Sequence, residues 1–230
     1  MDEPSDERST PVGRRTVLGL LGLGAAGVIG GSHVQSVLSR WLAPLEQNDP
    51  TGLLSLFPLG ATFRYYSVVG SVPPRSRAAY RLAVSGLIEA PHTYRFDELA
   101  AMPQTSFTRD FQCVTGWRVP EVRWSGVRLS TLIDAARPTG TARAVRFRSF
   151  DGTYTENMTL EQARASDVIV ALRMLGGPVT HDHGGPVRIY AGSLYGYKST
   201  KWLSGIELTD RNVPGYWEDR GYPLDGTISN

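Results

Sequence analysis

The stretch FQCVTGW, residues 111–117, contains the single cysteine of the chain. Because there is no second cysteine, Cys113 cannot form an intramolecular disulfide. A free cysteine either packs as a small apolar side chain or, as a thiolate, acts as a nucleophile or a soft metal ligand. The step from strand-like residues into Thr-Gly-Trp favours a position at the rim of a sheet, where the thiol would be accessible.

Two later stretches combine glycines, cations and hydroxyls. In HDHGGPVRIYAG, residues 181–192, the pair Gly184-Gly185 would let a ligand approach the backbone closely, and Arg188 follows on a predicted strand. In GSLYGYKSTKW, residues 192–202, the lysines, serine and threonine suit a phosphate or another anion. The alternatives are a simple turn at Gly-Gly-Pro and solvated lysines.

Histidines offer another reading of the same region. His181 and His183 form an H-x-H pair that would face one side of a strand and could bind zinc. Zinc needs at least three protein ligands, and only His33, His92 and Cys113 could complete the set. A zinc hydrolase is therefore retained as an alternative.

These residues must be positioned by short elements. From about residue 61 short apolar runs alternate with turns, which predicts a mixed α+β fold dominated by strands. Predicted strands occupy residues 80–86, 105–114, 142–150, 167–174, 186–192 and 200–210. Predicted short helices occupy residues 96–103, 129–136 and 160–165. Thr159 and Gln162 predict a capping box for the last helix, and Asp151-Gly152 predicts a hairpin turn.

The composition limits the function classes. Of the 230 residues 41% are hydrophobic and 20% charged, which predicts a packed globular core. A net charge of +2 and scattered arginines argue against nucleic-acid binding. The sequence has no phosphate-binding GxxxxGKS/T loop, no GxSxG nucleophile elbow and no C-x-x-C-H haem motif.

The N-terminal part predicts export. Two adjacent arginines directly precede an apolar run, residues 17–31, which is shorter than the roughly 20 residues of a membrane-spanning helix. The pattern resembles a twin-arginine signal, whose substrates cross the membrane already folded. We therefore expect a signal or N-terminal anchor at residues 1–31, a linker at 32–60 and a single domain at 61–230. The expected location is periplasmic or otherwise extracytoplasmic.

The motifs occur in an order that resembles the sulfite oxidase-like molybdopterin-dependent oxidoreductases. The order is C-V-T-G-W, then W-S-G-V-x-L-x-x-L-I-D, S-F-D-G, H-G-G-P-V-R and Y-G-Y-K-S-T-K-W, within residues 61–222. The small exported bacterial members, similar to the catalytic subunit of periplasmic methionine sulfoxide reductase, are the nearest in pattern. The resemblance implies a β-rich molybdopterin-binding fold with short peripheral helices and one molybdopterin per chain.

The resemblance also implies roles for individual residues. In the family a cysteine thiolate binds molybdenum, and only Cys113 can match it. An arginine and a G-x-K-like loop hold the phosphate end of the pterin, and Arg188 and the run Ser199, Thr200, Lys201 stand at those places.

Further positions match the family less closely. His183 and Ser149 fall where relatives carry pterin-contacting side chains, and Arg118 matches an arginine near the metal that could orient a polar substrate. For Arg118 a surface salt bridge is the alternative. Arg64 and Tyr65, in the early aromatic-rich contact segment, stand where the sulfoxide reductase type has Tyr and Glu.

The expected activity is that of an exported mononuclear molybdenum oxidoreductase. It would transfer an oxygen atom and two electrons to or from a small substrate, such as a sulfoxide or another S- or N-oxide. Electrons would pass through a separate partner, for example a membrane cytochrome or a quinone-linked protein. The alternatives are a sulfite-type oxidase and a metal-free binding module on the same scaffold.

Overall fold

The computed structural model describes residue 63 and residues 67–228. The predicted signal at 1–31 and linker at 32–60 lie outside the described residues, as do Arg64 and Tyr65. Within the described part, no helix is both long enough and apolar enough to cross a membrane.

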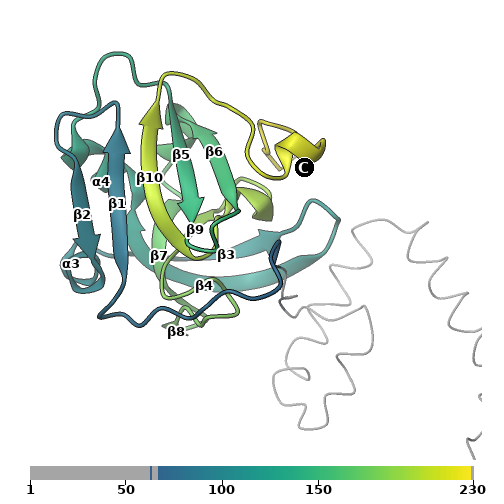
Figure 1. Cartoon of the computed structure of the whole chain (residues 1–230). Helices are drawn as coiled ribbons and strands as arrows, with labels where there is room; N and C mark the ends of the chain where they lie inside the picture. The colour runs from purple at the N-terminus through teal and green to yellow at the C-terminus, as the bar shows by residue number, and fades with distance from the viewer. Residues whose placement is uncertain (1–62, 64–66, 229–230) are drawn as a thin grey trace, which may run out of the picture. The chain divides into compact units, whose positions relative to one another are not determined.

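The first sheet contains five strands in the spatial order β2-β1-β10-β5-β6 (Figure 1). They span His92–Arg95 (β2), Arg81–Gly86 (β1), Leu203–Thr209 (β10), Ala144–Ser149 (β5) and Thr155–Thr159 (β6). β1 and β10 are parallel, and the other neighbouring pairs are antiparallel. The turn at Asp151-Gly152 joins β5 to β6, so the predicted hairpin is confirmed. β6 ends the sheet, which leaves its outer edge for other segments to cover.

The second sheet is built on one long hairpin. Its strands span Thr105–Gln112 (β3), Arg118–Arg128 (β4), Val168–Met174 (β7), Gly177–Pro178 (β8) and Arg188–Ala191 (β9). β3 pairs with β4, β4 pairs with β7, and β7 pairs with β8 and β9, all antiparallel. In Figure 1 the β3–β4 hairpin runs beneath the first sheet and extends below the C-terminal segment.

The helices are short and connect the strands. They span Phe96–Ala101 (α3), Leu129–Ala136 (α4) and Leu160–Ala163 (α5), with 3-10 turns at Gly196–Lys198 (η2) and Glu218–Arg220 (η3). α5 begins with the predicted capping box: Gln162 N donates to Thr159 Oγ1 at 3.1 Å, and Thr159 N donates to Gln162 Oε1 at 3.0 Å.

The core lies on both faces of β7. One cluster packs α4 and the first sheet against one face, and a second cluster covers the other. Members of the first cluster include Leu82, Leu132, Phe147, Val170 and Ile206. Members of the second include Phe111, Val122, Trp124, Ile169 and Tyr190. Burial on both faces explains why this strand has the most continuous apolar run of the chain.

The fold class predicted from the sequence is confirmed, since a β-rich α+β architecture with short helices is observed. The predicted strands and helices are present with somewhat shorter ends. No strand was predicted over β4, which has 11 residues and contains Pro120, a residue type that disfavours strand pairing. The structure places that proline at a bulge, where Glu121 has a φ of 52° and its N–H donates to Asp110 Oδ1 at 2.8 Å.

Candidate active site

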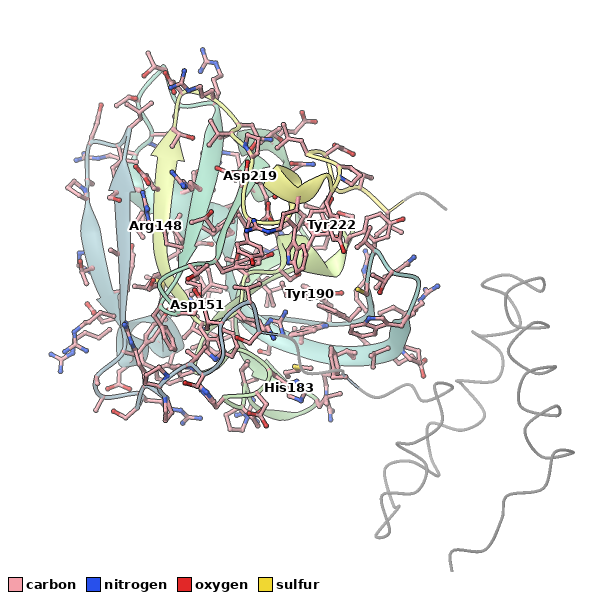
Figure 2. All side chains as sticks on the ribbon, turned by 45° about the vertical axis from the view of Figure 1, so that its right-hand side comes forward. Arg148, Asp151, His183, Tyr190, Asp219 and Tyr222 are labelled. Carbon is pink, nitrogen blue, oxygen red and sulfur yellow. The ribbon has the colours of Figure 1, made fainter. Side chains whose placement is uncertain are left out.

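A cavity of about 480 Å³ collects residues that are far apart in the sequence. Its volume is typical of small-molecule sites, which range over about 300–1,000 Å³. The lining comes mainly from the segments 111–117, 151–154, 182–188, 196–202 and 216–222. Figure 2 shows three of the lining residues, Asp151, His183 and Tyr222, on the same side of the domain.

Cys113 lies on this cavity, in the turn of the β3–β4 hairpin. Its N–H donates to Trp117 O at 2.9 Å and its carbonyl accepts from Gly116 N at 3.1 Å, so the backbone on either side is fixed. Its Sγ lies 3.2 Å from Thr115 Oγ1, and the residue is partly exposed. The thiol therefore stands at the rim of the sheet, as predicted, and not inside a core cluster.

Arg188 supplies a buried positive charge to the same cavity. Its guanidinium donates to three carbonyls, those of His183 at 2.7 Å, Ser199 at 3.1 Å and Ile189 at 3.2 Å. Burial lowers its pKa to about 10, which leaves it protonated at neutral pH. Within the described residues no carboxylate forms an ion pair with Arg188, so its charge is available to an anionic ligand.

Lys201 adds a second cation. Its Cβ and Cγ pack so closely on Gly184, which has a φ of +92°, that a Cβ there would come within 2.5 Å of them. The sequence suggested that a ligand would approach the backbone at Gly184, but the side chain of Lys201 occupies that space. Burial lowers the pKa of Lys201 to about 7, and Arg188 acts in the same direction. The ammonium is therefore close to its titration midpoint at neutral pH.

His183 is half-buried beside these cations. Burial lowers its pKa, and the charges of Arg188 and Lys201 lower it further. Its ring lies 5.1 Å from the ring of Phe63. At neutral pH the imidazole is neutral, so it can both donate and accept a hydrogen bond.

Ser199 and Thr200 lie beside Lys201 in sequence and hydrogen-bond to β9. Ser199 lines the cavity, and its Oγ accepts from Ala191 N at 3.2 Å. Thr200 is fully buried behind it, and among the described residues its Oγ1 has no hydrogen-bond partner. Thr200 is not among the lining residues, so its role toward a cofactor stays a prediction.

Besides Thr200, two further predicted site residues, Ser149 and Arg118, lie outside the cavity lining. The Oγ of buried Ser149 accepts from Asp151 N at 3.2 Å and supports the β5–β6 turn. Arg118 forms an ion pair with Asp110 and is about half exposed, which matches the alternative of a surface salt bridge. Their roles toward a cofactor or substrate stay predictions.

Five aromatic side chains on the cavity were not singled out as site residues from the sequence. They are Tyr154, Tyr197, Tyr216, Trp217 and Tyr222. The dense aromatic content of PGYWEDRGY, residues 214–222, was the available signal. Because this stretch has no regular period, only the tertiary structure shows that it faces the cavity.

The zinc alternative gains no support from the described residues. Among them, no group of three or more His, Cys, Asp or Glu side chains is placed to hold a metal. His181 lies with its ring 5.7 Å from that of Trp202, and its carbonyl accepts from Trp202 Nε1 at 3.0 Å.

The donor set suits a ligand that carries both a metal able to accept a thiolate and an anionic group. A thiolate from Cys113 is a soft ligand, whereas Arg188, Lys201 and Ser199 offer cations and a hydroxyl to phosphate oxygens. Sulfur and cations share one cavity, so the residues present fit a metal–pterin cofactor with a phosphate end.

Comparison with known proteins gives the same assignment. Residues 69–217 match the family model described as oxidoreductase molybdopterin binding domain. An uncharacterized oxidoreductase, YuiH, of Bacillus subtilis is 35% identical over 147 residues, which cover 64% of this chain and 74% of the relative. A putative protein-methionine-sulfoxide reductase subunit, YedZ1, of Azospira oryzae is 29% identical over 191 residues, which cover 83% of this chain and 72% of the relative.

A solved structure supports the fold independently. The sulfane dehydrogenase SoxCD from Paracoccus pantotrophus aligns with a TM-score of 0.55 and 21% identity, over 60% of this chain and 40% of that chain. At this identity the likeness concerns the fold alone. Together with the family match over most of the domain, it shows that the chain belongs to the sulfite oxidase-like family of molybdopterin-binding oxidoreductases.

Proposed function

We propose that this oxidoreductase reduces a small neutral S- or N-oxide, such as a sulfoxide. The observation that carries the proposal is the cavity that Cys113 shares with Arg188 and Lys201. In the balanced reaction a sulfoxide takes up two electrons and two protons and gives a thioether and water. Bound molybdopterin would supply the two-electron, oxygen-accepting chemistry.

The protein side of the proposal assigns roles to the predicted site residues that line the cavity. Cys113 would ligate the metal as a thiolate, and Arg188, Ser199 and Lys201 would hold the phosphate end of the cofactor. His183 would contact the pterin as a neutral imidazole. These side chains bind and orient, while the aromatic residues exclude water.

The direction of the reaction is argued from the charge distribution. Around Cys113 the lining residues Phe111, Val114 and Trp117 are uncharged, and Arg118 is already paired with Asp110. An anionic substrate such as sulfite would favour a free cation beside the metal ligand. The name of the Azospira relative, a putative methionine-sulfoxide reductase subunit, supports the same choice.

Export and electron supply form part of the proposal. The paired arginines and apolar run support passage through a folded-protein export route into the periplasm. The electrons would come from a separate redox protein, for example a membrane cytochrome or quinone-linked partner. The relative's description as a subunit supports a partner of this kind.

Metal analysis tests the role of Cys113. The chain is purified from a host that makes molybdopterin, and molybdenum and released pterin are measured per chain. We expect molybdenum in the wild type and both molybdenum and activity to fall at least about tenfold in Cys113→Ser, because a hydroxyl is a harder, more basic ligand than a thiol. Ser193→Ala, outside the cavity lining, is the control.

A substrate panel tests the reaction. Sulfoxides and N-oxides are supplied with a reduced viologen, and sulfite is supplied with ferricyanide. Turnover of sulfoxides but not sulfite supports the proposal, whereas turnover of sulfite alone supports the sulfite-type alternative. A wild-type protein without molybdenum or pterin would support the binding module instead.

A further inference from the structure

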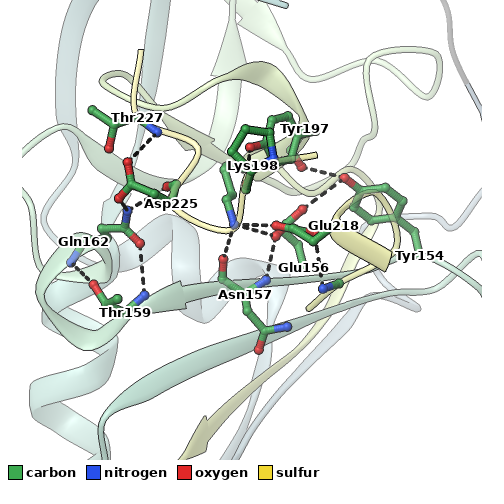
Figure 3. Close-up of polar contacts among 12 residues, drawn as sticks. Tyr154, Glu156, Asn157, Thr159, Gln162, Tyr197, Lys198, Glu218, Asp225 and Thr227 are labelled. Atoms are coloured by element: carbon green, nitrogen blue, oxygen red, sulfur yellow. Dashed lines mark hydrogen bonds and ion pairs between the residues drawn. The ribbon is translucent and has the colours of Figure 1, made fainter. Parts of the chain in front are cut away.

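A fully buried ion cluster joins three distant segments next to the cavity (Figure 3). Lys198 Nζ donates to Glu156 Oε1 at 3.0 Å, to Glu218 Oε1 at 2.5 Å and to the carbonyl of Asn157 at 3.0 Å. All three ammonium protons are thus used. The side chains of Lys198 and Glu156 are 0% exposed and that of Glu218 is 2% exposed.

The two carboxyl groups of the cluster have opposite pKa shifts. Burial raises the pKa of Glu156, and its hydrogen bond to Glu218 raises it further. Burial also opposes ionisation of Glu218, but hydrogen bonds from Glu156 and Lys198 outweigh it and lower the pKa of Glu218. The two shifts favour a proton on Glu156 over one on Glu218. A buried cluster of two carboxyl groups and one lysine is neutral when one carboxyl is protonated.

Glu218 ties the C-terminal segment Gly215–Tyr222 to the edge of the first sheet. Its Oε2 accepts from Gly215 N at 3.1 Å, and Tyr216 N donates to the carbonyl of Thr155 on β6 at 2.9 Å. A Cβ at Gly215 would lie 2.6 Å from that carbonyl, so only glycine permits this approach. The chain beyond the segment is fixed separately, since Tyr197 OH donates to Pro223 O at 2.5 Å.

The segment fixed in this way forms an aromatic wall of the cavity. Trp217 and Tyr222 stack with centroids 5.1 Å apart and an interplanar angle of 16°. Tyr216 stacks on Tyr154 at 5.8 Å, and Tyr197 meets Tyr222 edge-on at 5.3 Å. These five side chains offer aromatic faces to the cavity, whereas the lining cations Arg188 and Lys201 come from residues 183–201.

We propose that the segment Gly215–Tyr222 is the specificity-determining wall for the organic group of the substrate, and that Lys198 positions it through Glu218. The positioning by Lys198 rests on the contacts described above. The role of the segment in specificity rests on the proposed reduction of an S- or N-oxide. Aromatic faces attract thioether sulfur and apolar groups, so the wall selects substrates whose sulfur or nitrogen bears an aryl or alkyl group. Lys198, Glu156 and Glu218 are positioning residues, because they act through Tyr216, Trp217 and Tyr222.

Hydrogen exchange of the holoenzyme tests the positioning. The amides of residues 215–222 are expected to exchange at least about tenfold faster in Lys198→Met, which leaves Glu218 without its cation. The same is expected in Glu218→Ala, which removes the acceptor of Gly215 N–H and the contact of the segment with Lys198. The amides of β10 should keep their protection. Glu207→Ala, which removes the exposed ion pair with Arg148, is the matched control and should leave both regions unchanged.

A conservative variant keeps the test decisive. In Glu218→Gln, Glu156 can ionise and pair with Lys198, so the segment should stay within about threefold of wild-type exchange. If Glu218→Ala does not fold, Lys198→Met is compared with Glu218→Gln alone. Equal amide exchange of residues 215–222 in Lys198→Met and the wild type would overturn the positioning role.

Steady-state kinetics test the specificity. In Trp217→Ala, KM for methyl phenyl sulfoxide should rise at least about tenfold, and more than KM for dimethyl sulfoxide, because the aryl group loses its stacking partner. Phe107→Ala, an aromatic outside the cavity lining, is the control. If an active Trp217→Ala kept the wild-type ratio of KM for methyl phenyl sulfoxide to KM for dimethyl sulfoxide, the role of the segment in specificity would be overturned. A wild type that turns over no sulfoxide would overturn the proposed function, while the exchange result would still decide the positioning.

Discussion

At the scale of single residues, the cavity combines one soft ligand with two cations in different electrostatic states. Arg188 is locked by three carbonyls and stays protonated, with a pKa of about 10. Lys201 has a pKa of about 7 and is partly deprotonated at neutral pH. A guanidinium thus provides a permanent charge, and an amine provides one that depends on pH and on the ligand.

Anion affinity should consequently depend on pH through Lys201. Its pKa is lowered from 10.5 to about 7, so the ammonium is present below that pH and lost above it. In protein purified without cofactor, the affinity for sulfate should fall about tenfold between pH 6 and pH 8, as measured by calorimetry. Sulfate is the probe because its own charge does not change in this range.

An arginine at position 201 distinguishes the titration of Lys201 from that of other groups. Lys201→Arg keeps its charge at both pH values, so its sulfate affinity should vary by less than about threefold. If the wild type and Lys201→Arg had the same pH profile, a different group, such as His183, would be responsible.

At the scale of elements, the β3–β4 hairpin decides where the thiol stands. The bulge at Pro120 and Glu121 interrupts the strand pairing, and two further residue pairs lead from it into the turn that contains Cys113. Asp110 stabilises the bulge from the facing strand, because one carboxylate oxygen accepts from Glu121 N and the other faces Arg118. The carboxylate thus supports both strands at the base of the turn.

Loss of this carboxylate should weaken the hairpin. Asp110→Ala should lower the free energy of unfolding by about 1–3 kcal/mol, since a backbone N–H loses a charged acceptor. Asp110→Asn keeps an acceptor and should cost about half as much. Urea denaturation followed by circular dichroism measures both.

An exposed ion pair provides the comparison. Asp134→Ala removes the pair with Arg164 and should change the unfolding free energy by less than about 1 kcal/mol. If Asp110→Ala and Asp134→Ala lowered the free energy of unfolding equally, the contacts of Asp110 at the bulge would stabilise the domain no more than an exposed ion pair does.

At the scale of the whole domain, one core joins the two sheets. Leu132 on α4 is fully buried in the cluster that also contains Phe147 of the first sheet and Val170 of the second. The cavity is lined by loops from both sheets, so its shape depends on how the sheets pack.

A cavity-creating substitution tests this coupling. Leu132→Ala should lower the free energy of unfolding by about 2–5 kcal/mol. Because the core is shared, far-UV circular dichroism and tryptophan fluorescence should still report one coincident urea transition. Leu175→Ala, at a position 55% exposed, should change stability by less than about 0.5 kcal/mol. Two separate transitions in Leu132→Ala would mean that the sheets unfold independently.

The sequence by itself determined the features that depend on neighbouring residues. The capping box at Thr159 and Gln162, the hairpin turn at Asp151-Gly152 and the helix at 129–136 were all predicted correctly. Each is set by local hydrogen bonds or backbone preferences within a few residues. The motif order also indicated the family, and the rim position of Cys113 followed from the strand end that precedes it.

Only the tertiary structure decided the features that depend on distant partners. Lys198, for which solvation was one reading of the sequence, is fully buried because Glu156 and Glu218 reach it from 42 and 20 residues away. Arg118 points to Asp110 because the bulge brings them together. The aromatic residues of segment 215–222 face the cavity because Thr155 and Lys198, which are distant in sequence, hold the segment there. A buried charge or an aperiodic aromatic stretch has no local signature, since its partners, and not its neighbours in sequence, determine where it lies.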